Sequence, residues 1–173
     1  MNKTETPLFT FSDGLTFPSG TAFVVEFQGK QYVICPRHLV RSREIAKVEM
    51  KSGPDLLVST GPILNKEVQG LDLMVFEVQV NNGMTAFKLA EGVGDFNAPV
   101  TVLPSNISGT ALNRDEELMI ARLDESIPEG SSGSAVLNEA GEVVSMYIGA
   151  RNDNRITIHG VAAPLIIKTL QSL

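Results

Sequence analysis

The chain has 173 residues, with 14 basic against 20 acidic side chains, a formal net charge of −6 and a hydrophobic share of 43%. A chain of this length and composition can bury a substantial core, in one domain or in two small barrels, which excludes an intrinsically disordered protein. Because the net charge is negative and Lys and Arg form no long cluster, we expect no nucleic-acid partner.

The N-terminal segment, Met1–Phe11, lacks the long apolar core of a signal peptide. No stretch of the chain approaches the ~20 apolar residues that a membrane span needs, so we expect no membrane contact. Cys35 is the only cysteine, which rules out an internal disulfide and favours a reducing compartment. Together these features predict a soluble, cytoplasmic protein.

Short runs of β-branched and apolar residues recur between Gly, Pro and Asn residues, a pattern typical of an all-β sandwich or barrel. In the first half the expected strands are Thr21–Phe27, Gln31–Cys35, Glu44–Met50, Leu56–Thr60 and Leu73–Val80. In the second half they are Val100–Leu103, Leu118–Leu123, Ser134–Leu137, Glu142–Ile148 and Ile156–Ala162. Residues suited to tight hairpin turns occur at Gly29–Lys30, Asn81–Gly83 and Ala140–Gly141.

The segment Ala90–Asn97 is rich in glycine and has no apolar periodicity, as is typical of a linker between compact units. We therefore predict two domains, residues 1–93 and residues 94–173, each built on a β-barrel. Helical spacing of apolar residues occurs only in Ala163–Leu173, where Pro164 suits the first turn. This C-terminal helix should pack on the second barrel.

The most informative segment is Ile127–Leu137, IPEGSSGSAVL, in which two glycines bracket a serine and an apolar strand follows. A nucleophilic serine needs a tight turn that exposes its oxygen, with nearby N–H groups aimed at the anion that forms on the substrate carbonyl. Ser132 would be this nucleophile, and Gly130 and Ser132 would donate the N–H groups of the oxyanion hole. Taken alone, the pattern also fits a plain surface turn.

A serine nucleophile needs a base, and the chain has two histidines. His38 follows the strand-like run Gln31–Arg37, whereas His159 lies within a strand, where a pocket wall or a core position suits it better. The base needs a carboxylate that holds its tautomer, and Asp72 opens the apolar strand LMVF. Histidines and acids also end strands for ordinary structural reasons. The order His, Asp, Ser across two strand-rich halves is what favours catalysis.

These segments resemble the chymotrypsin and trypsin-like serine peptidases, in particular the bacterial HtrA-like type. The similarity runs from Gly20 to Leu173 and rests on GTAFVV with YVICPRHLV, on DLMVFEV, on IPEGSSGSAVL with NEAGEVV, and on GVAAP before the last helix. The resemblance implies an all-β fold of two antiparallel six-stranded β-barrels with a C-terminal helix. It implies a serine endopeptidase acting on polypeptide substrates, and neither a metal ion nor an organic cofactor.

By this resemblance, His38, Asp72 and Ser132 form the catalytic triad. Ser132 would attack the peptide carbonyl, His38 would take and return the proton, and Asp72 would orient His38 across the cleft between the barrels. One departure from the family pattern is Pro36, which fixes a backbone dihedral in the segment that places the base.

Two other functions stay open at this point. One is a catalytically silent, protease-like module whose cleft only binds a peptide. The other is an esterase acting on small acyl substrates, because acyl-enzyme chemistry does not itself demand a peptide. The presence of all three triad residues together with their glycines favours the peptidase over the silent module.

The resemblance also implies the walls of the primary substrate pocket, which are Ser126, Ile148, Gly149, Ala150, His159 and Gly160. Ser126 stands where trypsins hold an aspartate, so we expect no preference for Lys or Arg in the substrate. A polar or acidic side chain that reaches His159, or a small apolar one, fits this pocket better.

Ser131 stands where secreted trypsins have the aspartate that pairs with a newly cut N-terminus. A hydroxyl cannot balance a buried ammonium group, so we expect that the chain needs no N-terminal processing. Activity would then depend on an activating protein partner, on substrate-induced ordering of Glu129–Ser131, or on expression itself.

Overall fold

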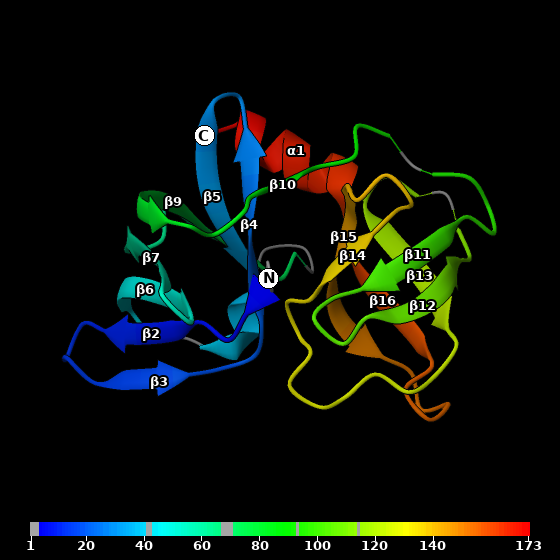
Figure 1. The fold of residues 1–173 in the computed structure, drawn as a ribbon, viewed down its shortest axis with the longest axis horizontal. Helices are drawn as coiled ribbons and strands as arrows, with labels where there is room; N and C mark the ends of the chain where they lie inside the picture. Colours follow the sequence, from blue (N-terminus) through cyan, green and yellow to red (C-terminus); the bar gives the residue numbers. More distant parts are fainter. Residues whose placement is uncertain (1–3, 41–42, 67–70, 93, 114) are drawn as a thin grey trace.

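The computed structural model describes residues 4–40, 43–66, 71–92, 94–113 and 115–173. Two β-sheets stand side by side, one from each half of the chain, and the single α-helix of the described residues lies along one edge of both (Figure 1). The predicted boundary between domains falls at residue 93, which lies outside the described residues.

The first half of the chain forms one curled sheet of ten strands in the order β1-β4-β5-β9-β7-β6-β2-β3, with β10 beside β4 and β8 beside β9. Its strands are β1 (Thr4–Glu5), β2 (Leu8–Phe11), β3 (Thr16–Pro18), β4 (Ala22–Phe27), β5 (Lys30–Cys35), β6 (Ile45–Ser52), β7 (Asp55–Thr60), β8 (Leu64–Lys66), β9 (Leu73–Asn82) and β10 (Phe87–Lys88). A short 3-10 helix, η1 (Arg37–Leu39), follows β5.

The second half forms a closed barrel of six antiparallel strands in the order β11-β12-β13-β16-β15-β14. Its strands are β11 (Pro99–Val102), β12 (Ile107–Ala111), β13 (Leu118–Leu123), β14 (Ala135–Leu137), β15 (Val143–Ala150) and β16 (Thr157–Ala162), and helix α1 (Ala163–Gln171) continues from β16. β14 closes the barrel because it pairs with both β11 and β15.

The prediction of two closed six-stranded barrels is therefore right for the second half and wrong for the first. In the first half, the free edge of β4 is taken by the short strands β1 and β10, and the free edge of β2 is taken by β3. Since these edges hydrogen-bond to short neighbours and not to each other, the sheet curls without closing.

The largest hydrophobic cluster lies between the two halves and belongs to both. It includes Phe23 and Ile34 from the first sheet, Ala135 and Met146 from the barrel, and Ile166 from α1, all fully buried. The helix packs on β15 and β16 of the second barrel, as expected from the sequence, and its buried face also belongs to the core shared by both sheets. This shared core fixes the position of one sheet relative to the other.

Each half also has a core of its own. In the first sheet it includes Phe9, Val33 and Met74, and in the barrel it includes Val102, Ile127 and Tyr147.

Among the residues that the structure describes, no helix is long and apolar enough to cross a membrane.

Candidate active site

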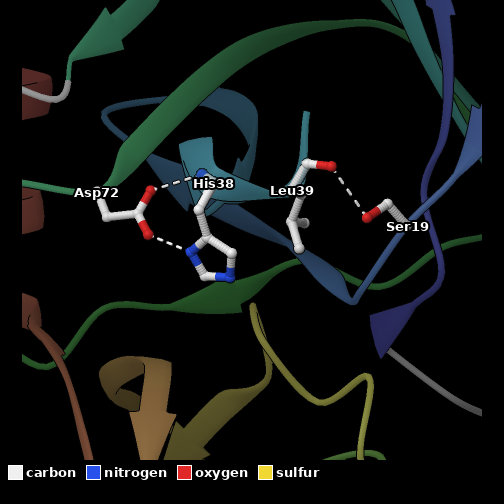
Figure 2. Close-up of polar contacts among 4 residues, drawn as sticks. All are labelled: Ser19, His38, Leu39 and Asp72. Carbon is white, nitrogen blue, oxygen red and sulfur yellow. Dashed lines mark hydrogen bonds and ion pairs between the residues drawn. The ribbon is translucent and has the colours of Figure 1, made fainter. Parts of the chain in front are cut away.

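His38 lies in η1, immediately after strand β5. Pro36 precedes this helix with an extended backbone, φ −72° and ψ 143°, which the proline ring adopts without strain. The carbonyl of Leu39 accepts a hydrogen bond of 3.1 Å from the Ser19 hydroxyl, which ties η1 to the segment that leads into β4 (Figure 2). Pro36 thus begins the turn that presents His38, and the Ser19 bond holds that turn in place.

Asp72 is brought to His38 by the pairing of their strands. β5 and β9 are antiparallel neighbours with Cys35 opposite Met74, so the residue before β9 lies beside the residues that follow β5. One carboxylate oxygen, Oδ1, accepts the backbone N–H of His38 at 2.8 Å, and the other, Oδ2, pairs with Nδ1 of the imidazole (Figure 2). A carboxylate only accepts, so Nδ1 carries the proton and the neutral ring keeps its lone pair on Nε2.

The electrostatics of this pair follow from the same contacts. The hydrogen bond and the negative charge of Asp72 raise the pKa of His38 above its ordinary value, although partial burial opposes them. Partial burial would raise the pKa of Asp72, but its hydrogen bonds to the ring and backbone N–H of His38 outweigh burial and lower it. The His38 side chain is 43% exposed and the Asp72 side chain 20% exposed, so the base is open to substrate while its partner is sheltered.

Ser132 lies in the turn that precedes β14, and this turn is anchored to the first sheet. The backbone N–H of Thr21 donates to the carbonyl of Ser132 at 2.8 Å, and the Thr21 hydroxyl donates to the carbonyl of Gly130 at 3.1 Å. Gly133 packs so closely that a Cβ atom there would lie 1.7 Å from the carbonyl oxygen of Thr21 and 3.0 Å from Cδ of Pro36. The structure thus places the Ser132 turn against the segment that carries His38.

The turn also holds itself through two neighbouring hydroxyls. Ser131 is buried, and its hydroxyl donates to the carbonyl of Pro128 at 2.6 Å; the buried Ser134 hydroxyl donates to the carbonyl of Ser131, also at 2.6 Å. Gly130 has φ +80°, which glycine adopts without a Cβ penalty, and no atom lies within 4 Å of the position that a Cβ would occupy. Open space therefore adjoins the turn at Gly130.

The predicted pocket residues lie on two paired strands and on the loop before Ser132. Gly149 of β15 pairs with His159 of β16, and a Cβ on Gly149 would lie 2.7 Å from Cε1 of the imidazole, so the ring covers this glycine. Partial burial, assisted by the charge of Arg151, lowers the pKa of His159, which keeps the ring neutral at neutral pH.

The other pocket candidates differ in what their side chains do. Ala150 is half-buried at the end of β15, and the exposed Ser126 binds the carbonyl of Asn154 through its hydroxyl. Ile148 packs against the shared core, and Gly160 of β16 is buried beside its neighbour β15, where a Cβ would lie 2.1 Å from the carbonyl oxygen of Met146. Ile148 and Gly160 also border a hollow next to Leu71.

A second hollow, of about 410 Å³, borders His38 itself. Its apolar walls are Phe11 and Phe17 of the β2–β3 hairpin and Leu39 of η1.

Within the part of the chain that the structure describes, no group of three His, Cys, Asp or Glu side chains is arranged to hold a metal ion. Cys35 is fully buried, which raises the pKa of its thiol, so it is an inert core residue.

Sequence reasoning missed two residues that shape the site. Thr21 supplies two hydrogen bonds to the Ser132 turn, and Arg155 donates to the carbonyls of Ile127 and Pro128. Thr21 begins an apolar strand and Arg155 lies in a polar loop, so neither position carries a local pattern that reveals its contacts.

Comparisons with known proteins concern the fold and the second half of the chain. A family model described as Peptidase S7, flavivirus NS3 serine protease, matches residues 108–162, which include the Gly130–Ser132 turn but neither His38 nor Asp72. No curated protein sequence matches the chain. The active form of the Rv3671c protease from M. tuberculosis is similar over 98% of this chain and 80% of that chain, with a TM-score of 0.71 and 16% identity. The inactive form is similar over 98% and 88%, with a TM-score of 0.69 and 16% identity.

The chain has the fold of a chymotrypsin-like serine peptidase, and its residues 108–162 match a serine-protease family model. At 16% identity the solved structures show the fold alone, and the match to the serine-protease family model covers residues 108–162. The HtrA-like subtype has no support in these comparisons and stays a prediction.

The close approach of Gly133 to Thr21 gives a test of how the peptidase positions its serine turn. We expect Gly133→Ala to abolish covalent labelling by a fluorophosphonate, because the new Cβ cannot lie 1.7 Å from the Thr21 carbonyl and the turn must move. The matched control is Gly141→Ala, which also has a positive φ, +80°, but meets no atom within 4 Å. It should lose only about 1 kcal/mol of stability and keep its labelling. Equal labelling of the two variants would contradict this account.

Proposed function

We propose that the chain is a serine endopeptidase that hydrolyses peptide bonds through an acyl-enzyme, with His38, Asp72 and Ser132 as its triad. The observation that carries the proposal is the double contact of Asp72, which binds both the ring and the backbone N–H of His38. This contact leaves Nε2 of His38 as the acceptor, and the Ser132 turn is anchored to the same sheet through Thr21.

The reaction follows from these roles. Ser132 Oγ attacks the substrate carbonyl carbon while Nε2 of His38 takes the hydroxyl proton, and the carbonyl oxygen becomes an anion that accepts the N–H groups of Gly130 and Ser132. The C–N bond then breaks and His38 gives its proton to the leaving amine. Water, activated by His38, hydrolyses the acyl-enzyme and releases the acid, which restores Ser132. Asp72 stays ionised and stabilises the imidazolium formed in each step.

Removal of either reacting side chain tests the proposal directly. We expect Ser132→Ala and His38→Ala to lower kcat/KM for a protein or peptide substrate by several orders of magnitude with little change in fold. Neither side chain is fully buried, so circular dichroism and thermal unfolding should match the wild type. Ser105→Ala, at an exposed position in the same barrel, should keep full activity. A Ser132→Ala protein as active as the control would reject the triad.

The raised pKa of His38 predicts how activity depends on pH. The base works only as the neutral imidazole, so kcat/KM should rise with pH, with a midpoint above the ordinary histidine value of about 6.5. In Asp72→Asn, the amide NH₂ would donate to Nδ1 and place the ring proton on Nε2, where it blocks catalysis. We expect a loss on the order of 10⁴ in kcat, as is typical when a Ser-His-Asp triad has the wrong histidine tautomer, and a midpoint at lower pH. A midpoint unchanged in Asp72→Asn would contradict the proposed pair.

The two rival functions predict different outcomes for simple assays. A silent peptide-binding module would bind peptides but would not react with a fluorophosphonate, since that reaction requires an activated serine. An esterase would react with the probe and would hydrolyse small acyl esters, but it would leave protein substrates intact. Cleavage of a protein substrate together with labelling of Ser132 separates the endopeptidase from both.

The substrate preference is proposed from the pocket residues. His159 offers a neutral imidazole over Gly149, and Ser126 brings no negative charge. We therefore expect the residue before the cleaved bond to be polar or acidic and within reach of His159, or small and apolar, and not Lys or Arg. A peptide-library cleavage profile measures this directly, and a profile dominated by basic residues would reject the assignment of the pocket.

The cytoplasmic location and the activating protein partner remain predictions from the sequence. A polypeptide substrate follows from the serine-protease class of the chain.

A further inference from the structure

Arg155 bridges the loop that leads into the Ser132 turn. Its Nε donates to the carbonyl of Ile127 at 2.9 Å and its Nη2 donates to the carbonyl of Pro128 at 3.1 Å, while its own carbonyl accepts the N–H of Ile127 at 3.1 Å. The planar guanidinium suits this arrangement, because it presents several donors in a fixed geometry. Residues 127 and 128 are thereby fixed just ahead of Gly130.

The contact continues from Pro128 into the turn itself. The carbonyl of Pro128 also accepts the Ser131 hydroxyl at 2.6 Å. The carbonyl of Ser131 in turn accepts both the backbone N–H and the hydroxyl of Ser134, at 2.9 Å and 2.6 Å. An unbroken series of contacts thus runs from the guanidinium through Pro128 to Ser131, which lies between Gly130 and Ser132, and on to Ser134.

The backbone around Arg155 is unusual in a way that matches this role. Asn154 and Arg155 both have positive φ, +65° and +62°, a conformation that is unfavourable for residues with a Cβ and that persists only where the surroundings enforce it. The carboxylate of Asp153 accepts the N–H groups of Ile156 and Thr157, at 3.3 Å and 3.1 Å, which closes the loop around this pair. Strained residues of this kind cluster at functional sites.

The charge of Arg155 also reaches the strand behind the turn. Burial raises the pKa of Tyr147, and the positive charge of Arg155 opposes that rise. Tyr147 accepts the N–H of Gly133 through its carbonyl at 2.8 Å, so this strand supports the turn from its other side. Arg155 therefore holds the loop at Ile127 and Pro128 on one side of the serine turn, and its charge acts on Tyr147 of the strand that contacts the turn.

We infer that Arg155 is a positioning residue that sets the geometry of the oxyanion hole, through its bonds to the carbonyls of Ile127 and Pro128. The inference rests on the proposed function, in which Ser132 is the nucleophile and the N–H groups of Gly130 and Ser132 bind the oxyanion. Removal of the guanidinium should weaken binding of the transition state and leave binding of the substrate in its ground state nearly unchanged.

The test compares Arg155→Ala and Arg155→Lys with the control Arg122→Ala, which removes an exposed cation of the same barrel on β13. Concentrations of active enzyme are set by titration with a fluorophosphonate, so that kcat refers to competent sites. We expect Arg155→Ala to lower kcat by about 10-fold to 100-fold, a part of the effect of losing one oxyanion donor, with KM within about threefold of wild type. Arg155→Lys should recover part of the loss, because a lysine keeps the charge but lacks the fork.

A peptide boronic acid gives a readout that a purely structural role would not change. Its boron forms a tetrahedral adduct with the serine oxygen and places a hydroxyl where the oxyanion would lie, so its Ki should weaken by the same factor as kcat in each Arg155 variant. If the active fraction falls while kcat and Ki per titrated site stay at wild-type values, Arg155 only supports the fold and the inference is wrong. Should Arg155→Ala fail to fold, Arg155→Gln and Arg155→Lys decide the question by the same two measurements.

Ser132→Ala in the same series distinguishes a failure of the role of Arg155 from a failure of the proposed function. If it is inactive while Arg155→Ala behaves like Arg122→Ala, the inference about Arg155 falls and the proposed function stands. If Ser132→Ala still cleaves the substrate, the proposed function falls and takes the role of Arg155 with it.

Discussion

The position of the serine turn against the first sheet depends on one main-chain contact, the hydrogen bond from the N–H of Thr21 to the carbonyl of Ser132. A main-chain N–H and a main-chain carbonyl have no side-chain torsions that could change the distance between their segments. This contact therefore fixes the position of the serine turn more tightly than a side-chain contact would. Gly133 makes it possible, because any Cβ would collide with Thr21 and push the turn away from Pro36. The shared core around Phe23, Met146 and Ile166 holds the two sheets at the separation that this bond requires.

The His38–Asp72 pair depends on a different constraint, the antiparallel pairing of β5 and β9. That pairing lies wholly within the first sheet, whereas the Ser132 turn belongs to the second barrel. The proposed triad therefore joins a pair fixed by strand register to a turn fixed by contact between sheets. Damage to the shared core would separate the Ser132 turn from the His38–Asp72 pair, even if the pairing of β5 with β9 survived. Neither half should therefore be active alone.

The sequence was informative where local pattern and local structure coincide. All ten strands expected from apolar runs occur within two residues of their expected bounds, and Asp72 contacts His38 as the motifs suggested. It was uninformative where edges and loops decide the outcome. Strands as short as β1 and β3 carry no periodicity, yet they occupy the edges that would otherwise close the first barrel. The part played by Thr21 was equally hidden, because its partners, Gly130 and Ser132, lie more than one hundred residues further along the chain.

The open first sheet has a consequence at the site. Because β2 pairs with β3 at its outer edge, the hairpin that joins them projects from the sheet, and its Phe17 forms a wall of the hollow beside His38 together with Phe11 and Leu39. Arg43 lies over the Phe11 ring, 3.9 Å from its centre, and pairs with Asp13 at 2.8 Å, so a cation–π contact and an ion pair brace this hairpin. The same strand pairing that leaves the barrel unclosed therefore supplies an apolar surface next to the proposed base. A closed barrel, with the outer edge of β2 paired to β4, would have no place for β3 and would lack this wall.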